Sequence, residues 1–161
     1  MLESFKPIVD ENSKILVLGS MPGEESLRQN QYYAFKRNQF WDIIYKVFDS
    51  EKSDEYEEKV KFLRENKIAL WDVIYKCNRE GSLDSNIKDE IPNDIFNLLN
   101  KYPNINYILF NGGKAEKSFK KHFGFKLPYN IEFYRMPSTS PAYTIKLKEK
   151  LKDWMIIKTL L

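Results

Sequence analysis

Residues 14–23 read Lys-Ile-Leu-Val-Leu-Gly-Ser-Met-Pro-Gly. The four residues 15–18 are all apolar, without the polar alternation of a half-exposed strand, and the run ends at Gly19. A short apolar run bounded by turn residues is typical of a strand that is buried on both faces of a parallel sheet. This stretch therefore predicts an α/β fold, with a glycine-rich loop at the carboxyl end of the first strand.

Apolar runs and helical patterns alternate along the rest of the chain. Further strands are expected at residues 68–74, 106–110 and 131–136, and helices after Asn38, at 53–65, with Pro92 in a first turn, at 113–123 and at 144–160. This order implies a three-layer α/β/α fold around a central, mostly parallel four-stranded sheet. A chain of 161 residues is long enough for one well-filled core, so we expect a single domain over residues 1–161.

Charge is unevenly distributed although the formal net charge is only +3. Residues 112–152 hold 10 Lys or Arg against 3 Glu, which leaves 16 basic and 20 acidic residues elsewhere. The C-terminal quarter is a candidate surface for a polyanion such as nucleic acid, and lysines on solvated helix faces are the alternative explanation.

The composition argues against three classes of protein: metal-binding, redox-active and membrane proteins. Cys77 is the only cysteine and His122 the only histidine, so neither a disulfide nor a His/Cys metal cluster is expected. No apolar stretch approaches the ~20 residues of a membrane span, and the first residues lack the apolar core of a signal peptide. We expect a cytoplasmic protein that uses no metal and no cofactor and does not bind a membrane.

Turn-forming residues collect where each predicted strand ends. They lie in residues 19–23, 77–86, 111–113 and 137–142. In open parallel sheets ligands bind beyond the carboxyl ends of the strands, so these four loops predict one shared site. Ordinary turn chemistry is the alternative reason for their composition.

Several motifs in these loops and between them resemble those of the uracil-DNA glycosylase superfamily, and most closely its sixth family, the hypoxanthine-DNA (deoxyinosine) glycosylases. They are Gly19-Ser20-Met21-Pro22-Gly23, Gln31-Tyr32-Tyr33-Ala34, Asn38-Gln39-Phe40-Trp41, Leu70-Trp71-Asp72-Val73, Gly81-Ser82-Leu83-Asp84-Ser85, Phe110-Asn111-Gly112 and Met136-Pro137-Ser138-Thr139-Ser140-Pro141-Ala142. The resemblance implies a monomeric, monofunctional DNA repair enzyme. It would flip a deaminated base out of DNA, with hypoxanthine as the expected base, and hydrolyse its N-glycosidic bond to leave an abasic site.

Met21 departs from the mismatch-specific members of the superfamily, which carry a water-positioning asparagine at this place. A thioether cannot orient water, so the chemistry must lie elsewhere. In the hypoxanthine family the catalytic asparagine belongs to the second segment, which maps to Asn38. Its amide oxygen would hold the attacking water; the alternative is that Asn38 only caps the next helix. Phe35-Lys36 and Tyr143 also depart from the family pattern, which has His-Pro and Asn at these places.

Other residues are assigned by the needs of the reaction. Asn111 offers a donor and an acceptor to the edge of the base, with a turn-forming role as the alternative. Tyr33 would stack on the base or pack in the core, and the backbone of Ser20, Met21 and Gly23 would bind the leaving base. The expected DNA contacts are Ser82, Ser85, Pro137, Ser138, Thr139 and Ser140, with Pro141, Ala142 and Tyr143 as a minor-groove wedge.

Three alternatives remain open at the level of sequence. A uracil or G/U mismatch glycosylase would keep the same fold and the same Asn38. A non-catalytic module for damaged DNA or nucleotides would leave Asn38 as a helix cap, and a small-molecule α/β enzyme would not bind DNA. No carboxylate is an obvious general base; Asp84 is the best acidic candidate, although a loop aspartate is usually a turn or cap residue.

Overall fold

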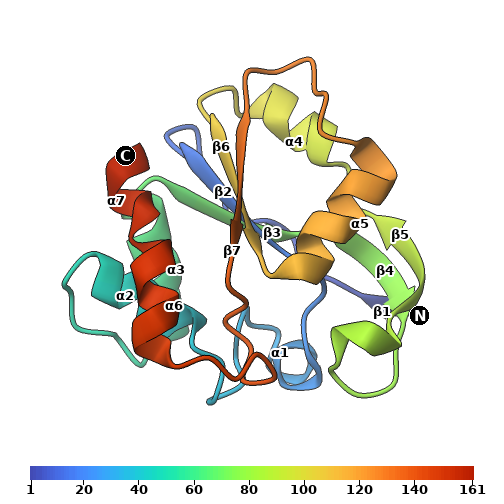
Figure 1. Ribbon diagram of the computed structural model, residues 1–161, viewed down its shortest axis with the longest axis horizontal. Helices are drawn as coiled ribbons and strands as arrows, with labels where there is room; N and C mark the ends of the chain where they lie inside the picture. Colours follow the sequence, from blue (N-terminus) through green and yellow to red (C-terminus); the bar gives the residue numbers. More distant parts are fainter.

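A four-stranded parallel sheet forms the centre of the computed structural model, which describes residues 1–161 (Figure 1). Its strand order is β3-β2-β6-β7, and every neighbouring pair is parallel. The strands are β2 (Ile15–Gly19), β3 (Ile68–Asp72), β6 (Tyr107–Asn111) and β7 (Glu132–Met136). The predicted α/β class and its four-stranded sheet are confirmed, and the sheet is wholly rather than mostly parallel.

Strand β2 is buried along its whole length because it lies between β3 and β6 and both sheet faces are covered. Ile15 and Val17 pack into one apolar cluster, whereas Leu16 and Leu18 pack into another. This alternation is the two-residue period of a strand. It explains why residues 15–18 are all apolar: each face of the strand meets its own helical layer.

Helices form a layer on each side of the sheet (Figure 1). The first layer contains α2 (Phe40–Val47), α3 (Tyr56–Glu65), α6 (Leu147–Trp154) and α7 (Ile156–Leu160). The second layer contains α4 (Ile95–Lys101) and α5 (Gly113–Phe123). The helix predicted at 113–123 is confirmed at both ends, and the three-layer arrangement is confirmed as well.

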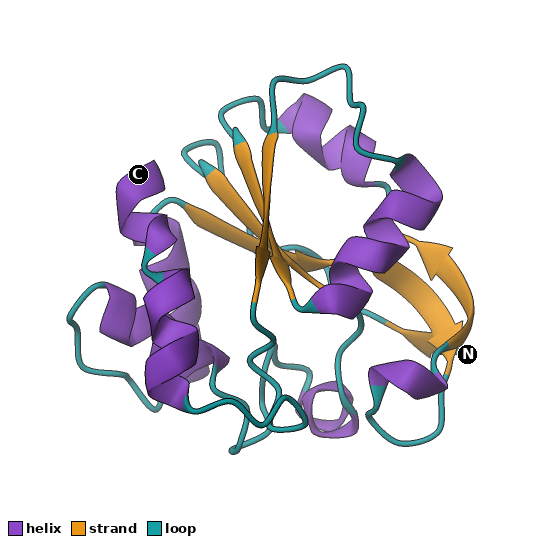
Figure 2. Ribbon diagram, viewed as in Figure 1, coloured by secondary structure: helices purple, strands orange, loops and turns teal.

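A second, antiparallel sheet was not expected from the sequence. It consists of β1 (Leu2–Glu3), β4 (Ile74–Asn78) and β5 (Lys88–Pro92), and it lies beyond α5 at the right of Figure 2. The strand predicted at 68–74 therefore ends early, at Asp72, and the chain passes through Val73 into another sheet. The Val73 N–H still bonds the carbonyl of Gly19, which anchors this crossing beside β2.

Several predicted helix boundaries were wrong. Pro92 ends β5 instead of opening a helix, and α4 begins three residues later, where the Asp94 carboxylate accepts the Asn97 N–H at 3.0 Å. The helix expected at 144–160 is two helices, α6 and α7, which meet at Met155. The short helix α1 (Glu24–Gln29), directly after the first loop, was not predicted.

Candidate functional site

The carboxyl ends of the four parallel strands open into one cavity of about 690 Å³. This edge lies at the bottom of Figure 1, where the loops after β2 and β7 meet α1. Besides predicted site residues, the lining includes Gly19, Pro22, Glu24, Glu25, Ser26, Tyr32, Phe35, Asp72, Leu83 and Asp84. The expectation that the four loops share one site therefore agrees with the structure.

Fourteen of the fifteen predicted site residues line this cavity. They are Ser20, Met21, Gly23, Tyr33, Asn38, Ser82, Ser85, Asn111, Ser138, Thr139, Ser140, Pro141, Ala142 and Tyr143. Pro137 is outside the lining, and its carbonyl accepts the indole N–H of Trp154 at 3.0 Å. Its visible contact is thus structural, joining the last loop to α6.

Asn38 lies just before α2, and its side chain both supports that helix and faces the cavity. The amide oxygen accepts the Phe40 N–H at 2.9 Å and the Thr139 hydroxyl at 2.9 Å. Two lone pairs are therefore engaged, and this oxygen is not free to hold water as the sequence suggested. The NH2 group has no hydrogen-bond partner within the protein, so Asn38 offers donors to the cavity.

Asn111 and Thr139 form the frame that fixes Asn38. The Asn111 amide donates to the Tyr33 hydroxyl at 2.9 Å and to the Thr139 hydroxyl at 3.0 Å, and its oxygen accepts the Thr139 N–H at 3.0 Å. Thr139 is only 1% exposed. Both residues hold the wall of the site together: Asn111 has little capacity left to read a base, and Thr139 is too deeply buried to meet DNA directly.

Tyr33 packs against the core and also borders the cavity. Its ring stacks on Phe40 with a centroid distance of 4.2 Å and an angle of 21°, while its residue also lines the cavity. The backbone adopts the left-handed conformation, with φ of 53°, which turns the chain sharply here. Burial, and then the nearby Asp72, raises the pKa of the Tyr33 hydroxyl, so it remains protonated and able to donate.

Asp72 is the site residue that the sequence reasoning missed. It ends β3, pairs in register with Gly19, and is 4% exposed. Its Oδ2 has no hydrogen-bond partner, and a Cβ atom on Gly19 would lie 2.5 Å from its Oδ1. Burial, and then the charge of Asp84, raises the pKa of Asp72 to about 7 against a smaller lowering by Arg79. The available signal was an acidic residue placed directly at the end of an apolar strand.

The serines of the site mainly hold its loops in place. Ser20 donates its hydroxyl to Asp84 at 2.7 Å, and the Ser82 hydroxyl accepts the Glu24 N–H at 2.9 Å, at the start of α1. Ser138 accepts the Ser140 N–H, and Ser140 accepts the Ala142 N–H, at 3.2 and 3.1 Å. These bonds shape the two loops that flank the cavity.

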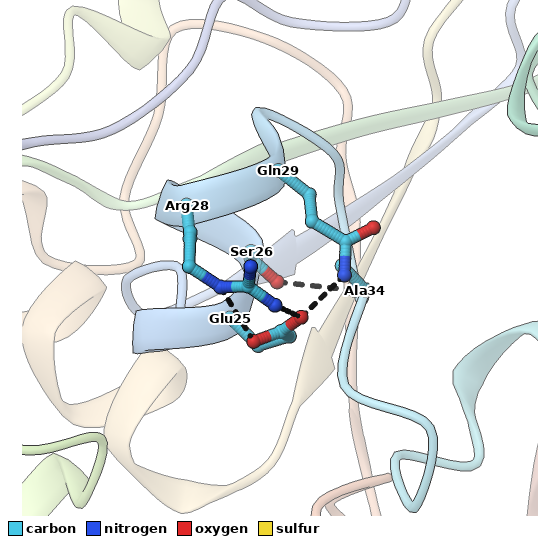
Figure 3. A network of polar contacts seen from close by, with 5 residues as sticks. All are labelled: Glu25, Ser26, Arg28, Gln29 and Ala34. Carbon is cyan, nitrogen blue, oxygen red and sulfur yellow. Dashed lines mark hydrogen bonds and ion pairs between the residues drawn. The ribbon is translucent and has the colours of Figure 1, made fainter.

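A polar network on α1 connects the first loop with the Tyr33-Ala34 segment (Figure 3). The Ser26 hydroxyl accepts the Ala34 N–H at 3.1 Å, while Glu25 is bonded by Arg28 and Gln29. Glu25 lines the cavity, and its pairing with Arg28 compensates a negative charge at the rim. This arrangement reduces repulsion toward an anionic ligand.

Comparison with known proteins decides the family. Residues 6–160 match the sequence model of the uracil DNA glycosylase superfamily. The chain belongs to this superfamily. Its match spans nearly the whole fold described above, including all four loops around the cavity.

Individual relatives agree with this membership of the uracil DNA glycosylase superfamily. A Methanosarcina barkeri protein named hypoxanthine DNA glycosylase is 41% identical over 114 residues, covering 70% of this chain and 72% of the relative. A Methanosarcina acetivorans protein of the same name is 45% identical over 151 residues, covering 93% of each. A solution NMR structure from M. acetivorans, provisionally named a uracil DNA glycosylase, has a TM-score of 0.84 and 36% identity, and covers 98% and 97% of the two chains.

This member of the superfamily has no group of three or more His, Cys, Asp or Glu side chains arranged to hold a metal ion. None of its helices combines the length and the apolar character that a membrane span requires. The polar side chains that line the cavity carry amide, hydroxyl and carboxyl groups.

Proposed function

We propose that this protein is a monofunctional DNA glycosylase that excises hypoxanthine from deoxyinosine in DNA and leaves an abasic site. Two relatives at 41% and 45% identity bear the name hypoxanthine DNA glycosylase, which supports this substrate. Membership of the uracil DNA glycosylase superfamily supports the reaction class. Its substrate would be DNA that contains a deaminated base.

The main structural support for this proposal is the cavity at the carboxyl ends of the parallel strands. Its volume of about 690 Å³ is within the usual range for small-ligand sites, and it suits a nucleotide extruded from the duplex. The exposed side chains of Phe35, Leu83 and Tyr143 belong to its lining. Tyr143, with Pro141 and Ala142, is proposed to fill the space that the flipped nucleotide leaves in the stack.

Asn38 is proposed to place the attacking water through its NH2 group. Since the amide oxygen is held by Thr139 and Phe40, the orientation of the NH2 group is fixed before substrate binds. A water that accepts one hydrogen bond from Asn38 keeps a second lone pair for C1′ of the sugar. Such fixed donors need no reorganisation during the reaction, which is why they lower its barrier.

Contacts to DNA are proposed for the surface of the two loops around the cavity. Ser82, Ser85, Ala142 and Tyr143 are exposed there and can meet phosphate or base steps. The Lys150 ammonium lies beneath this surface, donates to the Ser140 carbonyl at 3.1 Å and stands 5.4 Å from the Tyr143 ring centroid. It would keep the wedge loop in shape when DNA binds.

The test is excision from matched oligonucleotides that carry deoxyinosine, deoxyuridine or deoxyxanthosine, in duplex and in single strand. Asn38→Ala is compared with wild type and with Asn100→Ala, a control on the exposed side of α4. We expect deoxyinosine cleavage that falls at least a hundredfold in Asn38→Ala and is unchanged in the control.

Other outcomes would replace the proposal. Strong cleavage of deoxyuridine with little at deoxyinosine would make the protein a uracil or mismatch glycosylase, in line with the provisional name of the NMR relative. Binding of damaged DNA without any abasic site would make it a binding module, and absence of DNA binding would favour a small-molecule enzyme.

Domain organisation, assembly and location are proposed on simpler grounds. We infer one glycosylase domain over residues 1–161, because a single parallel sheet with both faces covered organises the chain. A monomer is proposed because one chain lines the whole cavity. A cytoplasmic location is proposed because DNA repair takes place where the DNA is.

A further inference from the structure

Asp72 is a buried acid for which the fold supplies no partner. Its Oδ2 is fully buried and accepts no hydrogen bond, although 96% of the residue is removed from solvent. An unpaired carboxyl group in such a place is costly, and it points to a role that does not concern stability. The same residue lines the cavity, so the group has access to whatever the cavity binds.

Gly19 leaves the space that Asp72 occupies. A Cβ atom at residue 19 would lie 2.5 Å from Asp72 Oδ1 and 2.8 Å from the Tyr33 hydroxyl oxygen. The carboxyl group and the hydroxyl therefore converge over the bare backbone of Gly19. No side chain separates them from the carboxyl end of β2, where the cavity begins.

The strand order sets Asp72 apart from Asn38. Asp72 ends β3, at one side of the sheet, whereas Asn38 is held by Thr139, which follows β7 at the other side. Two strands lie between β3 and β7, and the side chains of Tyr33 and Asn111 lie between the Asp72 carboxyl group and the bonded pair of Thr139 and Asn38. If water reaches the sugar from the side of Asn38, the departing base lies toward Asp72.

We propose that Asp72 is the general acid of the reaction, donating its carboxyl proton to a ring nitrogen of the departing purine. This inference rests on the proposed excision of hypoxanthine. As the bond between C1′ and the glycosidic nitrogen breaks, its electron pair stays with the base and the Asp72 proton neutralises it. Water forms the new C1′–O bond and releases a proton to solvent, from which the Asp72 carboxylate is protonated again. No oxidant, metal or further reactant is needed.

The surroundings of Asp72 favour its protonated form near neutral pH. Tyr32 and Tyr33 are neutral neighbours, and Asp84 adds a negative charge. Arg79 is the only cation among the groups that act on it, and its guanidinium donates to the carbonyls of Gly81 and Pro22. With the pKa of Asp72 at about 7, the excision rate should fall about tenfold per pH unit at higher pH.

The test measures single-turnover excision between pH 5 and 9 for wild type, Asp72→Asn and the exposed control Asp54→Asn. Two substrates are used: deoxyinosine and 7-methyl-deoxyinosine, whose base already carries the positive charge that protonation would supply. Wild type should lose activity on deoxyinosine above about pH 7. Asp72→Asn should be slower by about a hundredfold or more, without this pH dependence, and should match wild type within about threefold on the methylated base.

Each other outcome overturns the inference. An unchanged rate or pH profile in Asp72→Asn would remove Asp72 from proton transfer, and equal losses on both substrates would make it a structural residue. Thermal unfolding and DNA binding of each variant identify a folding defect; in that case Asp72→Ser, folded and tested in the same way, decides between these results. If wild type excises no deoxyinosine, the proposed function fails first and the inference fails with it.

Discussion

Thr139 connects three segments of the site through a single hydroxyl group. The hydroxyl accepts from Asn111 and donates to Asn38, each over about 3 Å, and Thr139 itself is almost completely buried. Thr139 belongs to the cavity lining, but its hydroxyl is fully engaged by Asn111 and Asn38, so we expect it to act by fixing the Asn38 amide. The half-buried serines on either side, Ser138 and Ser140, instead bond backbone N–H groups of their own loop.

We predict that Thr139→Val lowers the excision rate constant by about ten- to a hundredfold, because a buried hydrogen-bond partner is worth roughly 1–3 kcal/mol. Affinity for deoxyinosine-containing DNA should change little, since Thr139 lies inside the wall. Thr139→Ser keeps the hydroxyl and should recover most of the rate. Single-turnover kinetics and DNA titration of both variants make the test, and a loss in binding alone would contradict it.

The site residues differ in how far the sequence could predict them. Asn38, Tyr33 and Asn111 were found through motifs, but the partners of their polar atoms were not, because a hydrogen bond between residues 38 and 139 depends on tertiary placement. Asp72 carried only a weak signal: an aspartate after an apolar strand is usually a turn or cap residue. Its burial and missing partner are visible only once the sheet is assembled.

At the scale of elements, the antiparallel sheet is joined to α5 by a cluster of charges. Glu90 of β5 is bonded by Lys114 at 2.7 Å and by His122 at 3.0 Å, both from α5, and only 7% of its side chain is exposed. Burial raises the pKa of Glu90, but the hydrogen bonds from α5 outweigh this and lower it to about 2. The cluster thus explains the position of His122, which needs no catalytic role.

We predict that Glu90→Gln lowers the free energy of unfolding by about 2 kcal/mol at pH 7, because it leaves Lys114 with a weaker partner in a partly buried place. Since the folded pKa lies below the ordinary value of 4.5, this contribution is present above pH 4.5 and is lost as the pH falls toward 2. Urea unfolding at pH 7 and pH 3 measures both effects. Glu116→Gln, which removes an exposed 3.5 Å pair with Arg135, is the control and should change little.

The boundaries between elements were the least predictable part of the fold. The run from Ile68 to Ile74 contains neither Gly nor Pro. No turn-forming residue of these types therefore indicates that the chain leaves one sheet at Asp72 and enters another at Ile74. The same holds for Met155, between α6 and α7. The spacing of apolar residues predicted the buried strands and helices, because each element places apolar side chains on its buried faces. Which of two sheets a strand joins depends instead on contacts with residues far away in the sequence.

At the scale of the whole molecule, Asp72 should make the protein less stable as rising pH ionises its buried carboxyl group. Its folded pKa of about 7 exceeds the ordinary value of 3.8, so between these values the folded state holds a proton that the unfolded chain has released. The free energy of unfolding should therefore decline from about pH 4 to about pH 7 and then level off. We predict that Asp72→Asn removes this decline, so that the variant becomes more stable than wild type by a few kcal/mol above about pH 7.

Urea unfolding of both proteins at intervals from pH 4 to 8 measures the difference, with Asp54→Asn expected to follow wild type. Parallel curves for Asp72→Asn and wild type would mean that the buried carboxyl group does not titrate in this range. If the difference in free energy of unfolding between the two proteins grows with pH, the buried acid lowers the stability of the wild type.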